Sequence, residues 1–223
     1  MQTRLVSRIV IVVLLGPPGA GKGTQGERLA QRFGIPKIAT GDVFRTAVKE
    51  GTPLGLQAKQ YMERGELVPD SVILGIMREA LTSEDAAKGA ILDGVVRTVP
   101  QAEGFSTMVA DLCRKVDAVL LFEADEEELV RRLSERTTCD VCQTPYTGRD
   151  PGTPCPKHDG GTLVRRKDDE PDAIRTRLKV YREQTEPVVS WYEQHGMPIR
   201  RVDAIGPLDD VTQRAISVLN GTH

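Results

Sequence analysis

A glycine-rich turn between an apolar run and a helical pattern constrains the fold of this chain more than any other feature. The turn, Gly16 to Thr24, reads GPPGAGKGT and directly follows the apolar run at residues 9–15. Residues 25–33 then carry apolar side chains at helical spacing. A buried strand therefore enters a glycine turn that opens into a helix, an arrangement in which backbone N–H groups and the helix N-terminus bind an anion.

Two side chains in the turn narrow the anion to a nucleoside triphosphate. Lys22 supplies a point charge for the β- and γ-phosphates, and Thr24 supplies a hydroxyl group for Mg²⁺. Gly23 separates the two residues, whereas the general motif G-x-x-x-x-G-K-[ST] has them adjacent. A chance glycine turn would lack the flanking strand and helix, so the motif predicts nucleotide binding.

Charge and length exclude several other classes of protein. The chain has 223 residues, enough for one core with an inserted subdomain, and its net charge of −2 indicates no general affinity for nucleic acid or for an anionic membrane. Basic residues cluster at 131–132, 136 and 165–167, which we interpret as phosphate-binding arginines, with a solvated surface as the alternative. The apolar run is too short to span a membrane, and residues 1–8 do not resemble a signal peptide, so a cytoplasmic protein is expected.

Apolar runs alternate with segments of helical periodicity along the rest of the chain. The predicted strands are residues 9–15, 90–93, 118–122 and 199–202. The predicted helices are residues 25–33, 43–50, 53–64, 70–81, 100–115, 126–134, 172–193 and 209–219. Continuous apolar runs indicate strands covered on both faces. The pattern therefore predicts an α/β fold of three layers with a parallel central sheet.

One segment, residues 137–162, lacks this periodicity and holds three of the four cysteines. Cys139, Cys142, Cys155 and His158 have the spacing C-x2-C-x12-C-x2-H, which is typical of a closed structural zinc site. Asp159 is an alternative fourth ligand, and a redox pair or a disulfide is the alternative to metal. The segment is thus predicted to be a small insert held together by zinc. The fourth cysteine, Cys113, is expected to be a buried helical residue.

Several motifs in one order resemble the nucleoside monophosphate kinases, and the adenylate kinase family in particular. Besides the glycine turn they are Thr40-Gly41-Asp42 with Arg45, Gly65-Glu66-Leu67-Val68, Asp93-Gly94 followed by Arg97-Thr98 and Gln101, Arg132 and Arg136, Arg166-Lys167-Asp168-Asp169, and Arg177-Leu178 with Tyr181. The resemblance covers nearly the whole chain, and the cysteine insert is similar to the lid of the long, zinc-containing members. It implies transfer of phosphate from ATP to AMP to give two ADP, with Mg²⁺, by a monomer.

The family also implies a division into core and inserts. Residues 1–38, 69–134 and 170–223 would form the core, residues 39–68 an insert that binds the nucleoside monophosphate, and residues 135–169 the lid with its zinc site.

The resemblance assigns functional residues by position. ATP would be bound by Gly19, Ala20, Gly21, Lys22, Gly23, Thr24, Arg132, Arg136, Pro145, Tyr146 and Gly206. AMP would be bound by Thr40, Arg45, Glu66, Leu67, Val68, Gly94, Val95, Val96, Arg97, Gln101, Arg166 and Arg177. The catalytic residues would be Lys22, Arg97, Arg132, Arg136, Arg166 and Arg177.

Arginine forks suit phosphate oxygens, and phosphoryl transfer needs positioning, charge neutralisation and exclusion of water more than a general base. Asp93 ends a predicted strand, where a carboxylate with Thr24 would hold Mg²⁺ through water. Asp168 and Asp169 precede a predicted helix, where they either compensate its dipole or pair with lid arginines. Because lid closure excludes water, we expect slow ATP hydrolysis without AMP.

The chain departs from the family pattern in two places. Val95-Val96 replaces the usual Phe-Pro, so Val96 is expected to carry strain or to adopt a trans variant of the loop. Residues 202–206 replace a loop that commonly contains glycine and lysine, which leaves main-chain contact with adenine near Gly206 as the weaker assignment.

Three other functions are alternatives to this one. A different base preference (GTP as donor, or UMP or CMP as acceptor) stays open. A nucleotide-hydrolysing switch would need a water-positioning residue and a guanine motif, which the sequence lacks. A nucleic-acid-binding zinc module would need aromatic platforms and positive charge.

Overall fold

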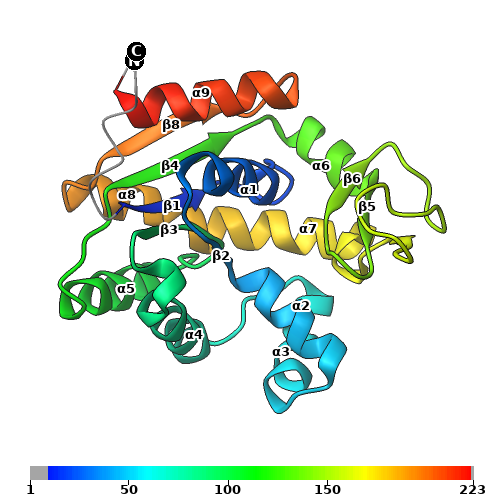
Figure 1. Ribbon diagram of the computed structural model, residues 1–223, viewed down its shortest axis with the longest axis horizontal. Helices are drawn as coiled ribbons and strands as arrows, with labels where there is room; N and C mark the ends of the chain where they lie inside the picture. Colours follow the sequence, from blue (N-terminus) through cyan, green and yellow to red (C-terminus); the bar gives the residue numbers. More distant parts are fainter. Residues whose placement is uncertain (1–9, 222–223) are drawn as a thin grey trace.

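The computed structural model describes residues 10–221, so the predicted strand residue Ile9 and residues 1–8, for which no signal peptide was expected, lie outside the described residues. Five parallel strands form the central sheet (Figure 1). Their spatial order is β2 (Lys37–Ala39), β3 (Gly89–Asp93), β1 (Val10–Leu15), β4 (Ala118–Glu123) and β8 (Ile199–Asp203). The predicted α/β fold with a parallel sheet is confirmed.

Strand β1 shows why the sheet has helices on both faces. Val13 and its alternate neighbours pack into one buried cluster, whereas Val12 and Leu14 pack into another. Helices α4 (Asp70–Thr82), α5 (Val99–Asp111) and α8 (Glu186–Gln194) contribute to the first cluster. Helices α1 (Lys22–Phe33), α6 (Glu126–Ser134), α7 (Pro171–Val180) and α9 (Leu208–Asn220) contribute to the second. An unbroken apolar run is therefore needed, because both faces of the strand are buried.

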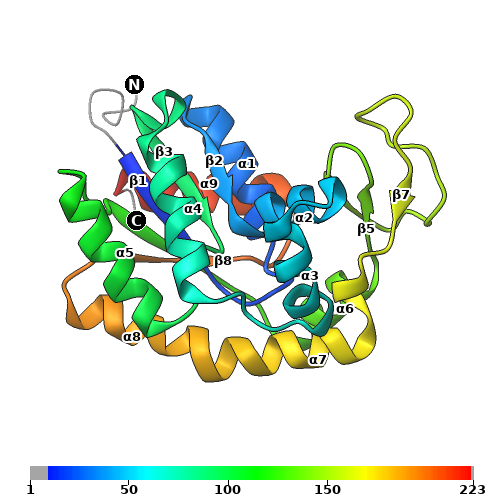
Figure 2. The same cartoon turned by 90° about the horizontal axis from the view of Figure 1, so that it is seen from below.

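Residues 39–68 form two helices that pack on each other, α2 (Thr40–Glu50) and α3 (Pro53–Arg64). Gly55 lies at their contact, where a Cβ atom would come within 2.1 Å of the Ala47 carbonyl oxygen. Thr52 caps α3 by accepting a hydrogen bond from the Gly55 amide, at 3.1 Å. The two helices lie at the same end of the molecule as the cysteine segment (Figures 1 and 2).

The cysteine segment contains a small antiparallel sheet that the sequence did not predict. Its order is β6 (Pro145–Thr147), β5 (Arg136–Cys139) and β7 (Leu163–Val164). A small cluster of Cys139, Cys155 and Leu163 is its only buried apolar group among the described residues. So few apolar contacts agree with a lobe that requires a metal to hold it.

Other differences from prediction concern short elements and helix ends. Strand β2 and the 3₁₀ turns η1 (Glu84–Ala86) and η2 (Lys167–Asp169) were not predicted. The predicted helix 172–193 is α7, a π-helical turn η3 (Tyr181–Thr185) and α8 in succession.

The expectation for Cys113 was wrong. Helix α5 ends at Asp111, and Cys113 is exposed with a φ of 53°. No helix within residues 10–221 has the length and apolar character required to cross a membrane.

Candidate active site

The loop between β1 and α1 depends on glycines. Gly16, Gly19 and Gly21 have φ values of 136°, 88° and 83°. A Cβ atom at Gly16 would lie 2.4 Å from the Phe122 carbonyl oxygen, and one at Gly19 would lie 2.9 Å from that of Leu129. Side chains at these positions would push the loop away from β4 and α6. The glycines thus let the loop lie close to β4 and α6, with the N-terminus of α1 following directly, an arrangement that can bind an anion.

Lys22 is the first residue of α1, and its ammonium group turns back over the loop. Its Nζ donates to the carbonyl oxygens of Gly16, at 2.7 Å, and Pro17, at 2.8 Å. Burial lowers the pKa of Lys22 to about 8; Asp93 acts against this shift, whereas Arg97 and other arginines add to it. The positive charge at this position is therefore unfavourable until an anion arrives.

A cleft of about 810 Å³ opens beside this loop. It is lined by the phosphate loop, by Thr24 and Asp93, and by Pro145, Tyr146 and Gly206. The arginines that line it are Arg28, Arg45, Arg97, Arg131, Arg132, Arg136, Arg166 and Arg177. Its volume is within the range of pockets that enclose a nucleotide-sized ligand. All the residues predicted to contact ATP therefore line one cavity.

The positive charges of the arginines in the cleft repel one another. Burial, and then the charges of Arg45 and Arg136, lower the pKa of Arg166 to about 9. Burial also lowers the pKa of Arg97 and of Arg177. Crowded, desolvated cations of this kind are stabilised by a polyanion, and phosphate groups have the charge and geometry that guanidinium groups bind.

Asp169 holds two of these arginines in place. Its carboxylate is buried and accepts from Arg136 Nε at 2.7 Å, from Arg136 Nη2 at 2.6 Å and from Arg177 Nη1 at 2.8 Å. Asp168 pairs with Arg177 at 3.3 Å. Burial acts against ionisation of Asp168, but Arg177 and Arg136 outweigh it and lower its pKa. Asp169 thus pairs with Arg136 of the predicted lid, whereas Arg177, the partner of both aspartates, lies on α7 in the predicted core.

A second, smaller cavity of about 90 Å³ adjoins the cleft. It is lined by Thr40, Gly41, Phe44, Arg45, Met62, Gly65, Glu66, Leu67, Val68, Ile73, Arg97, Gln101, Asp168 and Arg177. These include most of the residues assigned to AMP by resemblance. Arg45, Arg97 and Arg177 line both cavities.

The loop with the two valines is firmly held. Val95 and Val96 are buried in the core with trans peptide bonds, and neither residue lines the smaller cavity. Gly94 offers its carbonyl oxygen to Thr40 Oγ1 at 2.8 Å and to Arg97 Nε at 3.0 Å. The trans variant of the loop therefore still presents Arg97 to both cavities.

Asp70 and Thr185 support Arg97, and neither was predicted from the sequence to belong to the site. The Arg97 amide donates to Gln101 Oε1 at 2.7 Å, and Gln101 Nε2 donates to Asp70 Oδ1 at 2.7 Å. The Arg97 carbonyl accepts from Thr185 Oγ1 at 2.8 Å, where the π-helical turn places this buried threonine. The sequence signal for this contact was a threonine, Thr185, inside a predicted helix.

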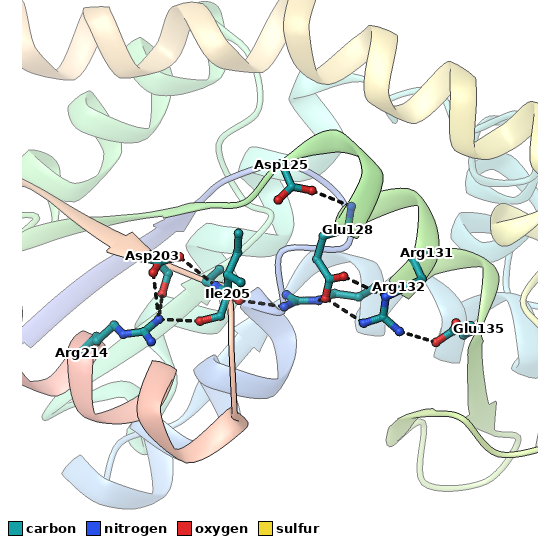
Figure 3. Close-up of polar contacts among 9 residues, drawn as sticks. Asp125, Glu128, Arg131, Arg132, Glu135, Asp203, Ile205 and Arg214 are labelled. Carbon is teal, nitrogen blue, oxygen red and sulfur yellow. Dashed lines mark hydrogen bonds and ion pairs between the residues drawn. The ribbon is translucent and has the colours of Figure 1, made fainter.

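A chain of polar contacts lies at a part of the cleft that the smaller cavity does not share (Figure 3). Arg132 donates from Nη2 to the Ala204 carbonyl oxygen at 2.9 Å and from Nε to Glu128 at 2.7 Å. Arg214 on α9 donates to the Asp203 and Ile205 carbonyl oxygens, both at 2.7 Å. None of Glu128, Asp203 and Arg214 was singled out from sequence.

Three thiols gather in the second insert. The sulfur atoms of Cys139, Cys142 and Cys155 lie within 4.8 Å of one another. Within the described residues this group includes neither His158 nor Asp159, which are both exposed. Three converging thiolates are a donor set that suits zinc.

Comparison with known proteins agrees with this geometry. The adenylate kinase family model matches residues 14–197. Adenylate kinase of Gemmatimonas aurantiaca is 67% identical over 211 residues, which cover 94% of this chain and 99% of that protein. Adenylate kinases of Syntrophobacter fumaroxidans and Staphylococcus aureus (strain Mu50) are 45% and 44% identical, over 93% and 94% of this chain and 99% and 98% of those proteins. With a phosphate loop, a cleft of arginines and relatives over almost its whole length, this chain belongs to the adenylate kinase family of enzymes.

Proposed function

We propose that the chain catalyses reversible, Mg²⁺-dependent transfer of a phosphoryl group from ATP to AMP, giving two ADP. One observation carries the proposal: Arg45, Arg97 and Arg177 line both the large cleft and the small cavity. Anions bound in the two cavities would therefore meet at shared guanidinium groups. A site for two nucleotides end to end suits transfer between them better than hydrolysis of one.

Phosphoryl transfer requires correct positioning of the two nucleotides and stabilisation of negative charge more than it requires proton transfer. An oxygen of the AMP phosphate forms a bond to the γ-phosphorus, the bond from that phosphorus to the β,γ-bridging oxygen breaks, and its electron pair stays on the departing ADP. The second pKa of a phosphate monoester is about 6, so the attacking oxygen is already ionised at neutral pH. Lys22 and the surrounding arginines then stabilise charge on the group in transit.

We assign residues 39–68 to acceptor binding. The smaller cavity combines apolar side chains of this insert with Thr40 and Arg45. Arg45 Nε is buried and has no hydrogen-bond partner within residues 10–221, although its Nη2 bonds to Asp42. An unpaired buried donor is costly, and an AMP phosphate oxygen would satisfy it.

We assign residues 135–169 to a lid that shuts out water. The lid reaches the acceptor insert at two points: Lys49 Nζ donates to the Asp140 carbonyl at 3.1 Å, and Lys167 pairs with Glu63 at 3.0 Å. Both contacts involve exposed side chains, which suits a contact that is made and broken in each cycle. ATP hydrolysis without AMP should then be slow, because an open lid leaves the site incomplete.

Two metals fit the residues present. The Thr24 hydroxyl and the Asp93 carboxylate both line the cleft and are the oxygen ligands that Mg²⁺ prefers. Bound with ATP, Mg²⁺ would neutralise charge on the phosphates. The three thiols would hold a structural zinc ion in the lid, with His158 or Asp159 as the fourth ligand.

We further propose a cytoplasmic monomer that binds no nucleic acid or membrane. The net charge of −2 supports the absence of polyanionic partners, and thiols gathered as metal ligands suit a reducing compartment.

The test is phosphorus NMR of ATP and Mg²⁺ mixed with AMP, GMP, UMP or CMP. We expect two ADP per ATP consumed with AMP, and rates at least about tenfold lower with the other acceptors. Lys22→Ala should reduce the rate at least about 100-fold, since it removes a charge aimed at the transferring group. The matched control Lys88→Ala alters an exposed lysine outside the cleft and should leave the rate unchanged. Release of inorganic phosphate at the same rate with and without AMP would refute the proposal.

A further inference from the structure

Two neighbouring arginines of α6 share one carboxylate, but they differ in exposure. Glu128 accepts from Arg132 Nε at 2.7 Å through Oε1 and from Arg131 Nε at 2.8 Å through Oε2. The Arg131 side chain is 52% exposed, whereas those of Arg132 and Glu128 are 20% and 22% exposed. Arg131 also pairs with Glu135 at 2.7 Å. Arg131 is thus the outer partner, and Arg132 is the inner one.

Arg132 joins α6 to the loop after β8. Its Nε binds Glu128 and its Nη2 binds the Ala204 carbonyl oxygen (Figure 3). Two contacts fix the plane of a guanidinium group, whereas one contact leaves it free to rotate. Because Arg132 lines the cleft, Glu128 and Ala204 together decide which way its flat face is presented.

The same loop is held from its other side by Arg214. Arg214 Nη1 bonds to the carbonyl oxygens of Asp203 and Ile205, and it also pairs with the Asp203 carboxylate at 3.3 Å. Successive carbonyl groups of an extended chain point in opposite directions. Those at 203 and 205 meet Arg214, and the one between them meets Arg132. Gly206 follows at a φ of 106° and lines the cleft.

Arg132 and the loop 203–206 form one wall of the large cleft. Glu128, Arg132, Ala204 and Gly206 line the large cleft but not the smaller cavity. Arg132 therefore belongs to a part of the large cleft that the smaller cavity does not share.

We propose that Glu128 is a positioning residue for the donor nucleotide: it holds Arg132 against Ala204, so that the wall of Arg132 and loop 203–206 is formed before ATP arrives. The inference rests on the proposed function, since it presumes that ATP occupies the large cleft. Hydrogen bonds from Arg131 and Arg132 lower the pKa of Glu128 to about 2, so this carboxylate is ionised throughout the assay range. Replacing Glu128 by glutamine therefore removes a charge and keeps an acceptor oxygen.

The experiment measures kcat and the two KM values separately. Glu128→Ala should raise KM for ATP about tenfold and leave KM for AMP and kcat within about twofold, because an interaction made equally in ground and transition states affects KM alone. The KM for ATP of Glu128→Gln should lie about midway, on a logarithmic scale, between those of the parent and of Glu128→Ala. Glu135→Ala, which removes only the outer contact to Arg131, should behave like the parent.

A double-mutant cycle separates positioning from a general structural role. If Glu128 acts through Arg132, adding Glu128→Ala to Arg132→Ala should change KM for ATP less than twofold. Calorimetric titration with ATP alone reports the same loss of affinity without turnover. Equal changes in both KM values, no change in either, or an undiminished effect in the Arg132→Ala background would overturn the inference.

Failure of the proposed function itself gives a different result, because the parent would then form no ADP from ATP and AMP. Should Glu128→Ala fail to fold by circular dichroism, Glu128→Gln carries the test. An unchanged KM for ATP in a folded Glu128→Gln variant would contradict the proposal.

Discussion

Lys22 provides the most quantitative prediction, because its charge is buried in the absence of nucleotide. The unfolded chain has a lysine pKa of 10.5, and burial lowers the folded value to about 8. Below about pH 8 both states carry the proton, and the folded state bears the full cost of the buried charge, about 3 kcal/mol at 1.36 kcal/mol per pKa unit. Between the two pKa values the folded state alone has lost its proton, so the contribution to stability improves as pH rises. Above about pH 10.5 the cost is absent.

The perturbation is Lys22→Met, which removes the titrating group. At pH 7.5 the variant should be more stable than the parent. This difference in the free energy of unfolding, the gap, should shrink by about 2 kcal/mol between pH 7.5 and pH 10. Other groups titrate in both proteins and cancel in the difference. Urea unfolding followed by fluorescence of Trp191, the single tryptophan, measures the gap.

Lys88→Met at an exposed position is the control, and its gap to the parent should not depend on pH. ATP places negative charge beside Lys22, so its binding should take up a proton above about pH 8 and weaken by up to about tenfold per pH unit. A gap for Lys22→Met that stays constant from pH 7.5 to pH 10 would refute the reasoning.

Three further predictions concern the supports of the site. Asp169→Asn leaves two mostly buried arginine side chains short of a counter-charge, so it should cost about 3–5 kcal/mol in urea unfolding and lower kcat; Asp172→Asn, at an exposed pair, should cost under about 0.5 kcal/mol. Zinc analysis should find one ion per chain, and a chelator or Cys142→Ser should lower the melting temperature by about 5 °C or more; an unchanged melting temperature after metal removal would contradict a structural zinc. Gly55→Ala should destabilise strongly, because the new Cβ would lie 2.1 Å from a backbone oxygen, whereas Gly75→Ala meets nothing within 4 Å and should gain up to about 1 kcal/mol.

The central strand and the phosphate loop were predictable because their signals are local. The run through Leu15 is apolar on both faces, and several glycines follow it directly in a turn that opens a helix. Helices α3 and α6 matched their predicted bounds because Pro53, Gly65 and Asp125 mark their ends. The six arginines that were predicted from their positions in family motifs all line one cleft.

Elements that depend on distant partners were not predictable. Strand β2 has three residues and exists because β3 pairs with it. Helix α5 was expected to continue to Lys115, but Arg114 instead bonds to the Leu81 carbonyl at 2.7 Å. A contact 33 residues away in sequence thus outweighs local helical preference.

The supports of the site follow the same rule. Asp169 reaches Arg136 across the lid, and Arg132 reaches Ala204 across 72 residues. Glu128 is four residues before Arg132 on α6, a spacing common on exposed helices. Only the bond from Arg132 to Ala204 distinguishes this pair from an ordinary surface ion pair.

The central claim, two nucleotides held end to end, is tested most directly by binding stoichiometry. Calorimetric titration would use AMP together with an ATP analogue whose β,γ-bridge cannot be cleaved. The account predicts one molecule of each bound per chain at the same time, with the AMP site lost in Arg97→Ala and the analogue site largely retained. Competition between the two ligands for a single site would contradict it.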